Sequence, residues 1–161
     1  MKVGILPGSQ ILNHILNLKI IIMKKVENGK SVVVHYTGKY EDGTIFDTSE
    51  GRDPLKTIMG QGNLIPGFEN NILNMNEGEE KTFVVEPVDG YGEYLKGLVT
   101  KIPTTMVPPS VKVGDVLKSE GERGVINVMV KRIDENEVEI DANHPMAGKK
   151  LFFDVKIVDI I

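Results

Sequence analysis

The sequence contains no cysteine. A disulfide framework, a thiolate metal site and a cysteine nucleophile are therefore excluded, and the chain fits a reducing compartment, so we expect it to be cytoplasmic. A basic stripe is also missing, because the net charge is -4 and the Lys and Arg residues are scattered along the chain. Nucleic acid is consequently not expected as a partner.

The composition is that of a packed globular protein, with 40% hydrophobic and 26% charged residues. Such a composition disfavours a disordered or a fibrous chain. The length of 161 residues gives room for one full core, or for a compact domain that carries a smaller domain inserted or appended.

The common catalytic and metal-binding motifs are missing as well. No P-loop, nucleophile elbow or H-E-x-x-H zinc motif occurs. The run GQGNLIPG at residues 60–67 begins like a dinucleotide-binding loop, but its third glycine position is Ile65. The acidic run DENEVEIDANH lacks the Gly and the Glu of a calcium loop and is better explained as a solvated hairpin. We therefore expect no cofactor and no bound metal.

The three histidines, His14, His35 and His144, lie far apart without ligand spacing. His35 is interpreted as a strand residue with a satisfied ring. His144 precedes a proline and can equally be a loop cap.

Residues 1–22 are an N-terminal extension of unusual composition. The segment from Ile5 to Met23 is rich in Ile and Leu, but polar residues, a proline and a glycine interrupt it, so it is a poor transmembrane span. No cleavage pattern of a signal peptide follows it. Three interpretations remain: a docked segment, a weak membrane-associating helix, and translated sequence upstream of a true start at Met23. We favour the last, and membrane association is not expected.

Alternating patterns predict several strands and one helix. Residues 32–37 alternate in the period of a strand with two distinct faces, and they lead into a hairpin with its turn at Asp42-Gly43. Helical spacing starts at Pro66 and continues to Met75, and Gly78 closes it. Further strands are expected at residues 81–86 and 151–157, the second of them central because it is apolar on both faces. The predicted class is α+β with an antiparallel sheet.

The character of the sequence changes between Gly92 and Met146. A proline-rich stretch precedes two β-like runs, residues 125–132 and 137–140, which a polar DENE turn joins. The pattern of the first domain resumes only at Lys149. This order favours an inserted unit over a C-terminal appendage.

A small set of aromatic and apolar residues could form a site. Its members are Tyr36, Phe46, Asp47, Leu64, Ile65, Phe68, Tyr91 and Phe153. One interpretation makes all the aromatics core residues and Asp47 a turn residue. However, a carboxylate between core-forming aromatics needs a hydrogen-bond partner, and Tyr36 can donate its hydroxyl if its strand lies beside Asp47. Both interpretations remain open on spacing alone.

Several motifs together resemble a known family. The runs VVVHYTGKYEDGTIFDTS, GNLIPGFENNILNMNEGEE, YG at Tyr91-Gly92 and LFFDVKIVDI are similar to the FKBP-type peptidyl-prolyl isomerases, and the run ending in DANHPMAGKKL resembles their SlyD-like subtype. The resemblance implies an FKBP-like antiparallel half-barrel wrapped on one short helix, with a small mostly-β domain inserted in the flap loop. The implied isomerase domain is residues 23–95 and 142–161, and the implied insert-in-flap chaperone domain is residues 96–141.

The same resemblance implies the roles of individual residues. A shallow apolar pocket would be formed by Tyr36, Phe46, Asp47, Ile65, Phe68, Tyr91 and Phe153, with Leu55, Leu64 and Met146 as substrate-binding residues. Phe68 stands where many relatives have a tryptophan, which puts affinity for the macrolide inhibitors of the family in doubt. No metal-binding tail is present in this sequence, so metal binding is not carried over.

The implied function is cis-trans isomerisation of X-Pro bonds in unfolded or partly folded, proline-containing polypeptides by a non-covalent mechanism. The insert would act as a chaperone, and its apolar surface is predicted at Ile102, Met106, Val107, Val128 and Met129. An equally open interpretation places these five residues in a small core of the insert. The rival function is a non-catalytic holdase chaperone on the same fold. A monomer is expected.

Overall fold

The computed structural model describes residues 7–10, 12 and 23–161. Most of the N-terminal extension, including His14, therefore lies outside the described residues, and so does the choice among its three interpretations. Within the described residues, no helix is long and apolar enough to cross a membrane.

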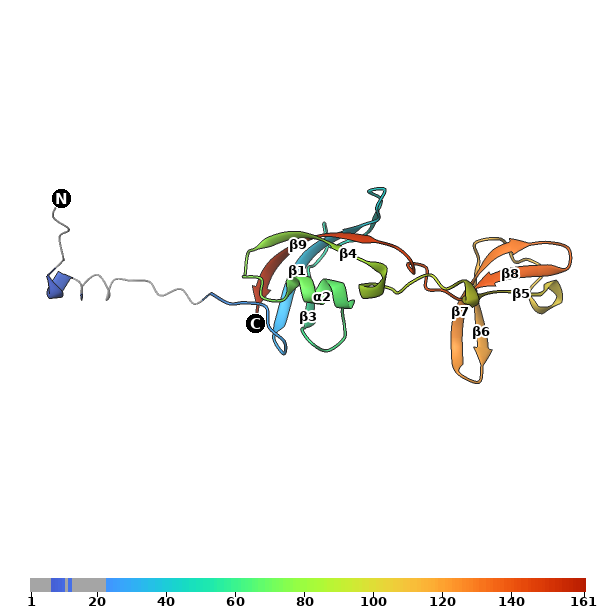
Figure 1. The fold of residues 1–161 in the computed structure, drawn as a ribbon, viewed down its shortest axis with the longest axis horizontal. Coiled ribbons are helices and arrows are strands. Elements are labelled where there is room, and N and C mark those ends of the chain that lie inside the picture. Colours follow the sequence, from blue (N-terminus) through green and yellow to red (C-terminus); the bar gives the residue numbers. More distant parts are fainter. Residues whose placement is uncertain (1–6, 11, 13–22) are drawn as a thin grey trace.

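The chain forms two antiparallel sheets, and Figure 1 shows the second sheet beyond the start of β9, away from helix α2. The first sheet has the order β2-β1-β9-β4, and β3 also pairs with β1. Its strands are β1 (Ser31–Lys39), β2 (Ile45–Thr48), β3 (Leu55–Ile58), β4 (Glu80–Val85) and β9 (Leu151–Ile160). The second sheet has the order β5-β8-β7-β6. Its strands are β5 (Val99–Pro103), β6 (Val116–Gly121), β7 (Gly124–Ile133) and β8 (Glu137–Asp141).

The predicted hairpin is confirmed. Strands β1 and β2 pair in antiparallel register, with Gly38 opposite Asp47. The turn between them is closed by Tyr40, whose N–H donates to the carbonyl of Thr44 at 2.8 Å. Gly43 has a φ of +87°, a conformation that side chains disfavour, which explains the glycine after Asp42.

The prediction of a central C-terminal strand is also confirmed, because β9 lies between β1 and β4. Both of its neighbours precede residues 96–141 in the chain, so the second sheet is connected between two strands of the first. Three short 3₁₀ helices lie between β4 and β9: η1 (Pro87–Asp89), η2 (Lys96–Leu98) and η3 (Thr104–Met106).

Helix α2 (Pro66–Ile72) is shorter than the predicted helix. It begins at the proline as expected, but it ends before Asn74, which has a φ of +68°. The backbone groups that would continue the helix bond elsewhere: Asn74 N–H donates to the carbonyl of Val26, and Val26 N–H donates to the carbonyl of Met75. Gly78 closes a later turn and not the helix.

The main core lies between the first sheet and α2. It includes Val32 and Val34 of β1, Phe68 and Ile72 of α2, and Phe153 of β9, all of them less than 6% exposed. The sheet supplies the alternating apolar face that the sequence predicted, and the helix covers it.

The second sheet has a small core of its own. Val128 and Val130 of β7 and Val138 of β8 are at most 4% exposed. The prediction that Val128 belongs to an apolar surface is therefore wrong, because this side chain is buried inside the second sheet. Met106 is 70% exposed, whereas Ile102, Val107 and Met129 are half-buried.

Candidate functional site

The structure has a cavity of about 450 Å³ on the face of the first sheet that α2 covers in part. Side chains from β1, β2, β3, β9, the start of α2 and the loops around them line it. They are Tyr36, Phe46, Asp47, Leu55, Gly62, Asn63, Leu64, Ile65, Pro66, Phe68, Tyr91 and Phe153. Nine of the ten residues predicted for the pocket thus lie around one cavity. The exception is Met146, which packs against the core and does not line the cavity.

The floor of the cavity is a cluster of aromatic rings. Phe68 lies edge-on to Phe153 with 5.0 Å between ring centroids, and it lies edge-on to Tyr36 at 6.2 Å. Phe46 is edge-on to Phe153 at 5.7 Å. Edge-to-face contacts of this kind favour fixed ring orientations, so the floor is a rigid apolar surface.

The polar rim of the cavity is a hydrogen bond between Tyr36 and Asp47. The Tyr36 hydroxyl donates to Asp47 Oδ2 at 2.6 Å. The two residues lie on the same face because Thr37 pairs with Thr48 and Gly38 with Asp47, which leaves Tyr36 on the diagonal to Asp47. The partner that the sequence required for this carboxylate is therefore Tyr36, as predicted.

This hydrogen bond changes the pKa of both groups. The pKa of Asp47 is lowered, first by the hydrogen bond from Tyr36, against the opposing effect of burial, and further by Arg52. Burial and then the hydrogen bond to Asp47 raise the pKa of Tyr36. Asp47 is consequently an ionised acceptor at neutral pH and Tyr36 a neutral donor.

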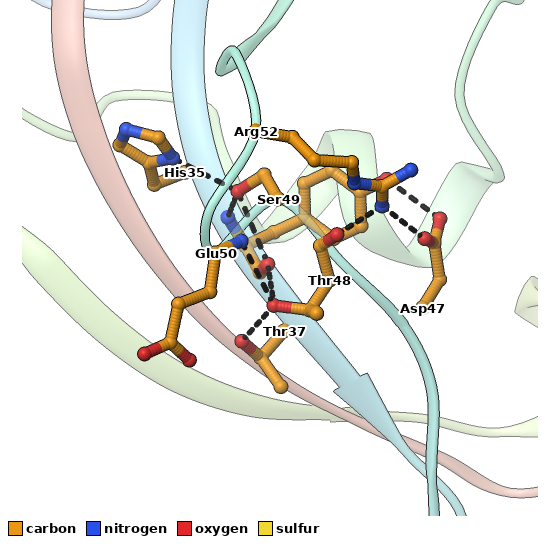
Figure 2. A network of polar contacts seen from close by, with 8 residues as sticks. His35, Thr37, Asp47, Thr48, Ser49, Glu50 and Arg52 are labelled. Carbon is orange, nitrogen blue, oxygen red and sulfur yellow. Dashed lines mark hydrogen bonds and ion pairs between the residues drawn. The ribbon is translucent and has the colours of Figure 1, made fainter.

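Arg52 is a contributor that the sequence reasoning missed. Its Nη2 lies 2.7 Å from Asp47 Oδ1 and also donates to the carbonyl of Thr48 (Figure 2). Each carboxylate oxygen of Asp47 thus has its own donor. An arginine five residues after the carboxylate is a weak signal in a sequence, because only the turn after β2 brings the two side chains together.

A second network holds the end of β2 against β1. Ser49 is 2% exposed, and its Oγ accepts the N–H of Tyr36 at 2.8 Å and lies 2.9 Å from His35 Nδ1. Next to it, the hydroxyls of Thr37 and Thr48 are 2.8 Å apart (Figure 2). These bonds fix the register of β1 and β2, the two strands that carry Tyr36 and Asp47. They also show His35 as a strand residue with a satisfied ring.

The entrance of α2 contributes backbone to the cavity. Ile65 is the N-cap residue, and its carbonyl accepts from Phe68 and Glu69. Within the described part of the chain, no hydrogen bond occupies the Ile65 N–H. Gly62 and Asn63 from the preceding loop also line the cavity, although neither is among the site residues predicted from the sequence. In the described residues, no group of three or more acidic or histidine side chains could hold a metal ion.

Residues 23–158 match the family described as FKBP-type peptidyl-prolyl cis-trans isomerase. This match spans most of the chain. The chain belongs to the FKBP-type peptidyl-prolyl cis-trans isomerase family.

Curated relatives with the name FKBP-type peptidyl-prolyl cis-trans isomerase SlyD refine the subtype. The protein of Treponema pallidum (strain Nichols) is 32% identical over 135 residues, which cover 83% of this chain and 77% of the relative. That of Escherichia coli (strain K12) is 31% identical over 138 residues, covering 84% and 70%. That of Haemophilus influenzae is 30% identical over 136 residues, covering 83% and 72%. This FKBP-type isomerase is therefore SlyD-like.

Proposed function

We propose that the cavity at Tyr36 and Asp47 catalyses cis-trans isomerisation of X-Pro bonds in unfolded or partly folded polypeptides. The observation that carries the proposal is the rigid aromatic floor with a single polar pair, Tyr36 and Asp47, at its rim. An apolar floor suits the proline ring. The polar pair and the Ile65 N–H suit the amide that flanks it.

The chemistry needs no nucleophile. An X-Pro bond interconverts over a barrier of roughly 18–20 kcal/mol, because twisting destroys the resonance of the amide. The planar amide is more polar than the twisted amide, so an apolar cavity disfavours the ground state more than the transition state. A gain of about four powers of ten requires roughly 5–6 kcal/mol. Loss of water, proline binding on Phe68 and hydrogen bonds to the twisted amide are the three contributions.

Asp47 has the role of an orienting acceptor in this proposal. Its lowered pKa keeps it ionised, so it does not hold a proton to give, and the reaction transfers none. Ionised Asp47 holds the Tyr36 hydroxyl at the rim, and Arg52 and the Ser49 network hold Asp47. The N–H of Ile65 is proposed as the donor to the substrate carbonyl.

The experiment is refolding of a reporter protein whose slow phase is limited by proline isomerisation. The chain is added far below the reporter concentration. We expect acceleration of the slow phase, and we expect Asp47→Ala and Tyr36→Ala to weaken it. If refolding responds only near equimolar amounts, the fold acts as a holdase and the proposed catalysis is wrong.

We further propose that the second sheet is an inserted chaperone domain, residues 96–141, that binds unfolded chains. Support comes from apolar side chains on its surface, since Met106, Val125 and Ile126 are each more than half exposed. Its two connections lie side by side, because Asn143 Oδ1 accepts the N–H of Leu95 at 2.9 Å. A short loop could therefore replace the domain.

The test of this division of labour compares two substrates. Serine substitution of Met106, Val125 and Ile126 together, or removal of the insert, should leave activity on short peptides unchanged and reduce activity on an unfolded protein. Equal losses on both substrates would contradict separate roles.

The proposal also covers location, assembly and inhibitors. A cytoplasmic location is proposed, supported by the absence of cysteine from the sequence, and a monomer is proposed as well. Macrolide inhibitors of the family would enter the same cavity, and Phe68 offers them a smaller ring than a tryptophan would. Weak binding is expected in a titration against such an inhibitor.

A further inference from the structure

One wall of the cavity is held from outside the cavity. Tyr91 lines the cavity, and its ring stacks face to face on the ring of His144, with 4.5 Å between centroids and 10° between planes. His144 lies in the segment that returns from the second sheet to β9, residues 144–149, which we call the return segment. His144 itself does not line the cavity.

Hydrogen bonds from the described residues do not fix the ring of Tyr91. It lies in the loop after η1 and is 38% exposed. Among the described residues, no hydrogen bond holds its hydroxyl, and the backbone bond next to it, from Gly92 N–H to the carbonyl of Pro87, fixes the loop and not the ring. Within the part of the chain that the structure describes, the stack on His144 is the one aromatic contact of the Tyr91 ring.

His144 is well placed to act as a fixed support. The residue before it, Asn143, exchanges two hydrogen bonds with the backbone of Leu95, both at 2.9 Å. The imidazole Nδ1 of His144 accepts the N–H of Met146 at 3.0 Å. The return segment is tied to the Tyr91 loop a second time, because Gly148 N–H donates to the carbonyl of Gly92 at 2.7 Å.

We propose that His144 is a positioning residue of the isomerase, which holds the Tyr91 ring as a wall of the cavity through their stacked contact. The inference rests on the function proposed above for the cavity. It adds a route by which the segment that carries the second sheet sets the shape of the site. His144 touches no reacting group, so its effect passes through Tyr91 alone.

Two substitutions separate the stack from the loop hydrogen bond. His144→Phe keeps an aromatic face for Tyr91 and loses the acceptor for Met146 N–H. His144→Asn keeps an acceptor, because the amide oxygen takes the place of Nδ1, and loses the ring. The value of kcat/KM on a short proline peptide is measured for both variants and for the unchanged chain, together with the thermal midpoint and the ring-proton chemical shifts of Tyr91.

Loss of the stack is expected to lower kcat/KM by about three- to tenfold in His144→Asn, from the usual strength of an aromatic pair. In His144→Phe, kcat/KM should stay within about twofold of the unchanged chain, because the ring is retained. The Tyr91 ring protons should shift in His144→Asn and much less in His144→Phe.

The opposite order, with His144→Phe impaired and His144→Asn active, would assign His144 a loop-holding role only and overturn the inference. Full activity in both variants would overturn it as well. Neither result touches the proposed function, which fails only if the unchanged chain itself does not accelerate isomerisation. That last result would remove both proposals.

Discussion

Gly38 is the residue whose replacement tests the cavity most directly. It lies in β1, opposite Asp47 of β2 on one side and Phe153 of β9 on the other. A Cβ added there would overlap the Cζ of Phe46 and would lie 2.7 Å from its Cε2 and 3.0 Å from Phe153 Cε1. Gly38→Ala must therefore displace at least one of the two rings.

The structure indicates which ring moves. Phe153 is 5% exposed and packed against Phe68 and Phe83, whereas Phe46 is half-buried and faces the cavity. The Phe46 ring should therefore rotate into the cavity. Overpacking of this kind costs typically about 1–3 kcal/mol. For a chain of this size, each kcal/mol lowers the thermal midpoint by about 2–4 °C.

In Gly38→Ala, kcat/KM should fall even under conditions in which the protein stays folded. A displaced Phe46 ring occupies space that a proline ring would use, and a loss of about 1.4 kcal/mol in transition-state binding is tenfold in kcat/KM. The assay is peptide isomerisation at a temperature well below the midpoint of the variant, with thermal unfolding in parallel. We expect kcat/KM to drop by about tenfold or more while the protein remains folded.

Controls come from the same chain. Gly97→Ala adds a methyl group at a position with nothing within 4 Å, so it should leave both quantities unchanged. In the double variant Gly38→Ala with Phe46→Leu, the smaller side chain should restore part of the stability, which is coupling between contacting residues. If Gly38→Ala retains full activity and stability, then the rings do not close over β1 as described, and the account of the cavity wall is wrong.

Three further predictions concern polar groups. Tyr36→Phe should raise the pKa of Asp47, since that hydrogen bond is the main cause of its lowering; an NMR titration of the carboxyl with an unchanged midpoint would contradict this. The pKa of Asp47 in the folded state lies below its unfolded value of about 3.9, so ionised Asp47 contributes its full stabilisation above that pH. This contribution is lost as the pH falls through the folded pKa, and Tyr36→Phe should therefore shift the acid loss of stability to higher pH. Arg52→Met should cost less than about 1 kcal/mol in urea unfolding, because both side chains of its ion pair are exposed; a larger loss would refute a weak pair. Asp141→Asn should cost about 1–3 kcal/mol, because this buried carboxylate accepts hydrogen bonds from Asn143 and Tyr94, and faster hydrogen exchange near residue 141 would locate the effect; unchanged exchange there would speak against it.

Local patterns were enough to predict the elements that position the polar rim. The alternation of β1, the Asp42-Gly43 turn and the position of Phe46 and Asp47 directly after it fix the register of the hairpin. Once that register is fixed, Tyr36 must approach Asp47, because both side chains point to the same face. The central place of β9 followed from apolar residues on both of its faces.

Features that depend on distant contacts could not be predicted in the same way. Helix α2 ends at Ile72 because Asn74 and Met75 bond to Val26, a residue more than 40 positions earlier, and no local signal records this. No strand is predicted from the sequence at β3, whose four residues form a strand by pairing with β1. The sequence pattern at Val128 fits a surface residue and a core residue equally well. Alternation predicts that the strand has two faces, but it does not predict which face is covered.

The connection through the second sheet also has a consequence for assembly of the site. The cavity requires β9 to pair between β1 and β4, yet about 65 residues separate β4 from β9, and ordering a long loop is costly in entropy. Two of the three strand pairings in the second sheet, β6 with β7 and β7 with β8, join strands that are consecutive in the chain, and such local pairings form quickly. Once the second sheet has folded, the hydrogen bonds between Asn143 and Leu95 close residues 95–143, so that about 16 flexible residues remain between β4 and β9. This shortening is two halvings of loop length, which lowers the entropic cost of closing the loop by about 1.2 kcal/mol. Folding of the second sheet should therefore favour closure of the first, and substitutions that unfold it, such as Val138→Asp, should slow formation of the cavity even though no residue of that sheet lines it.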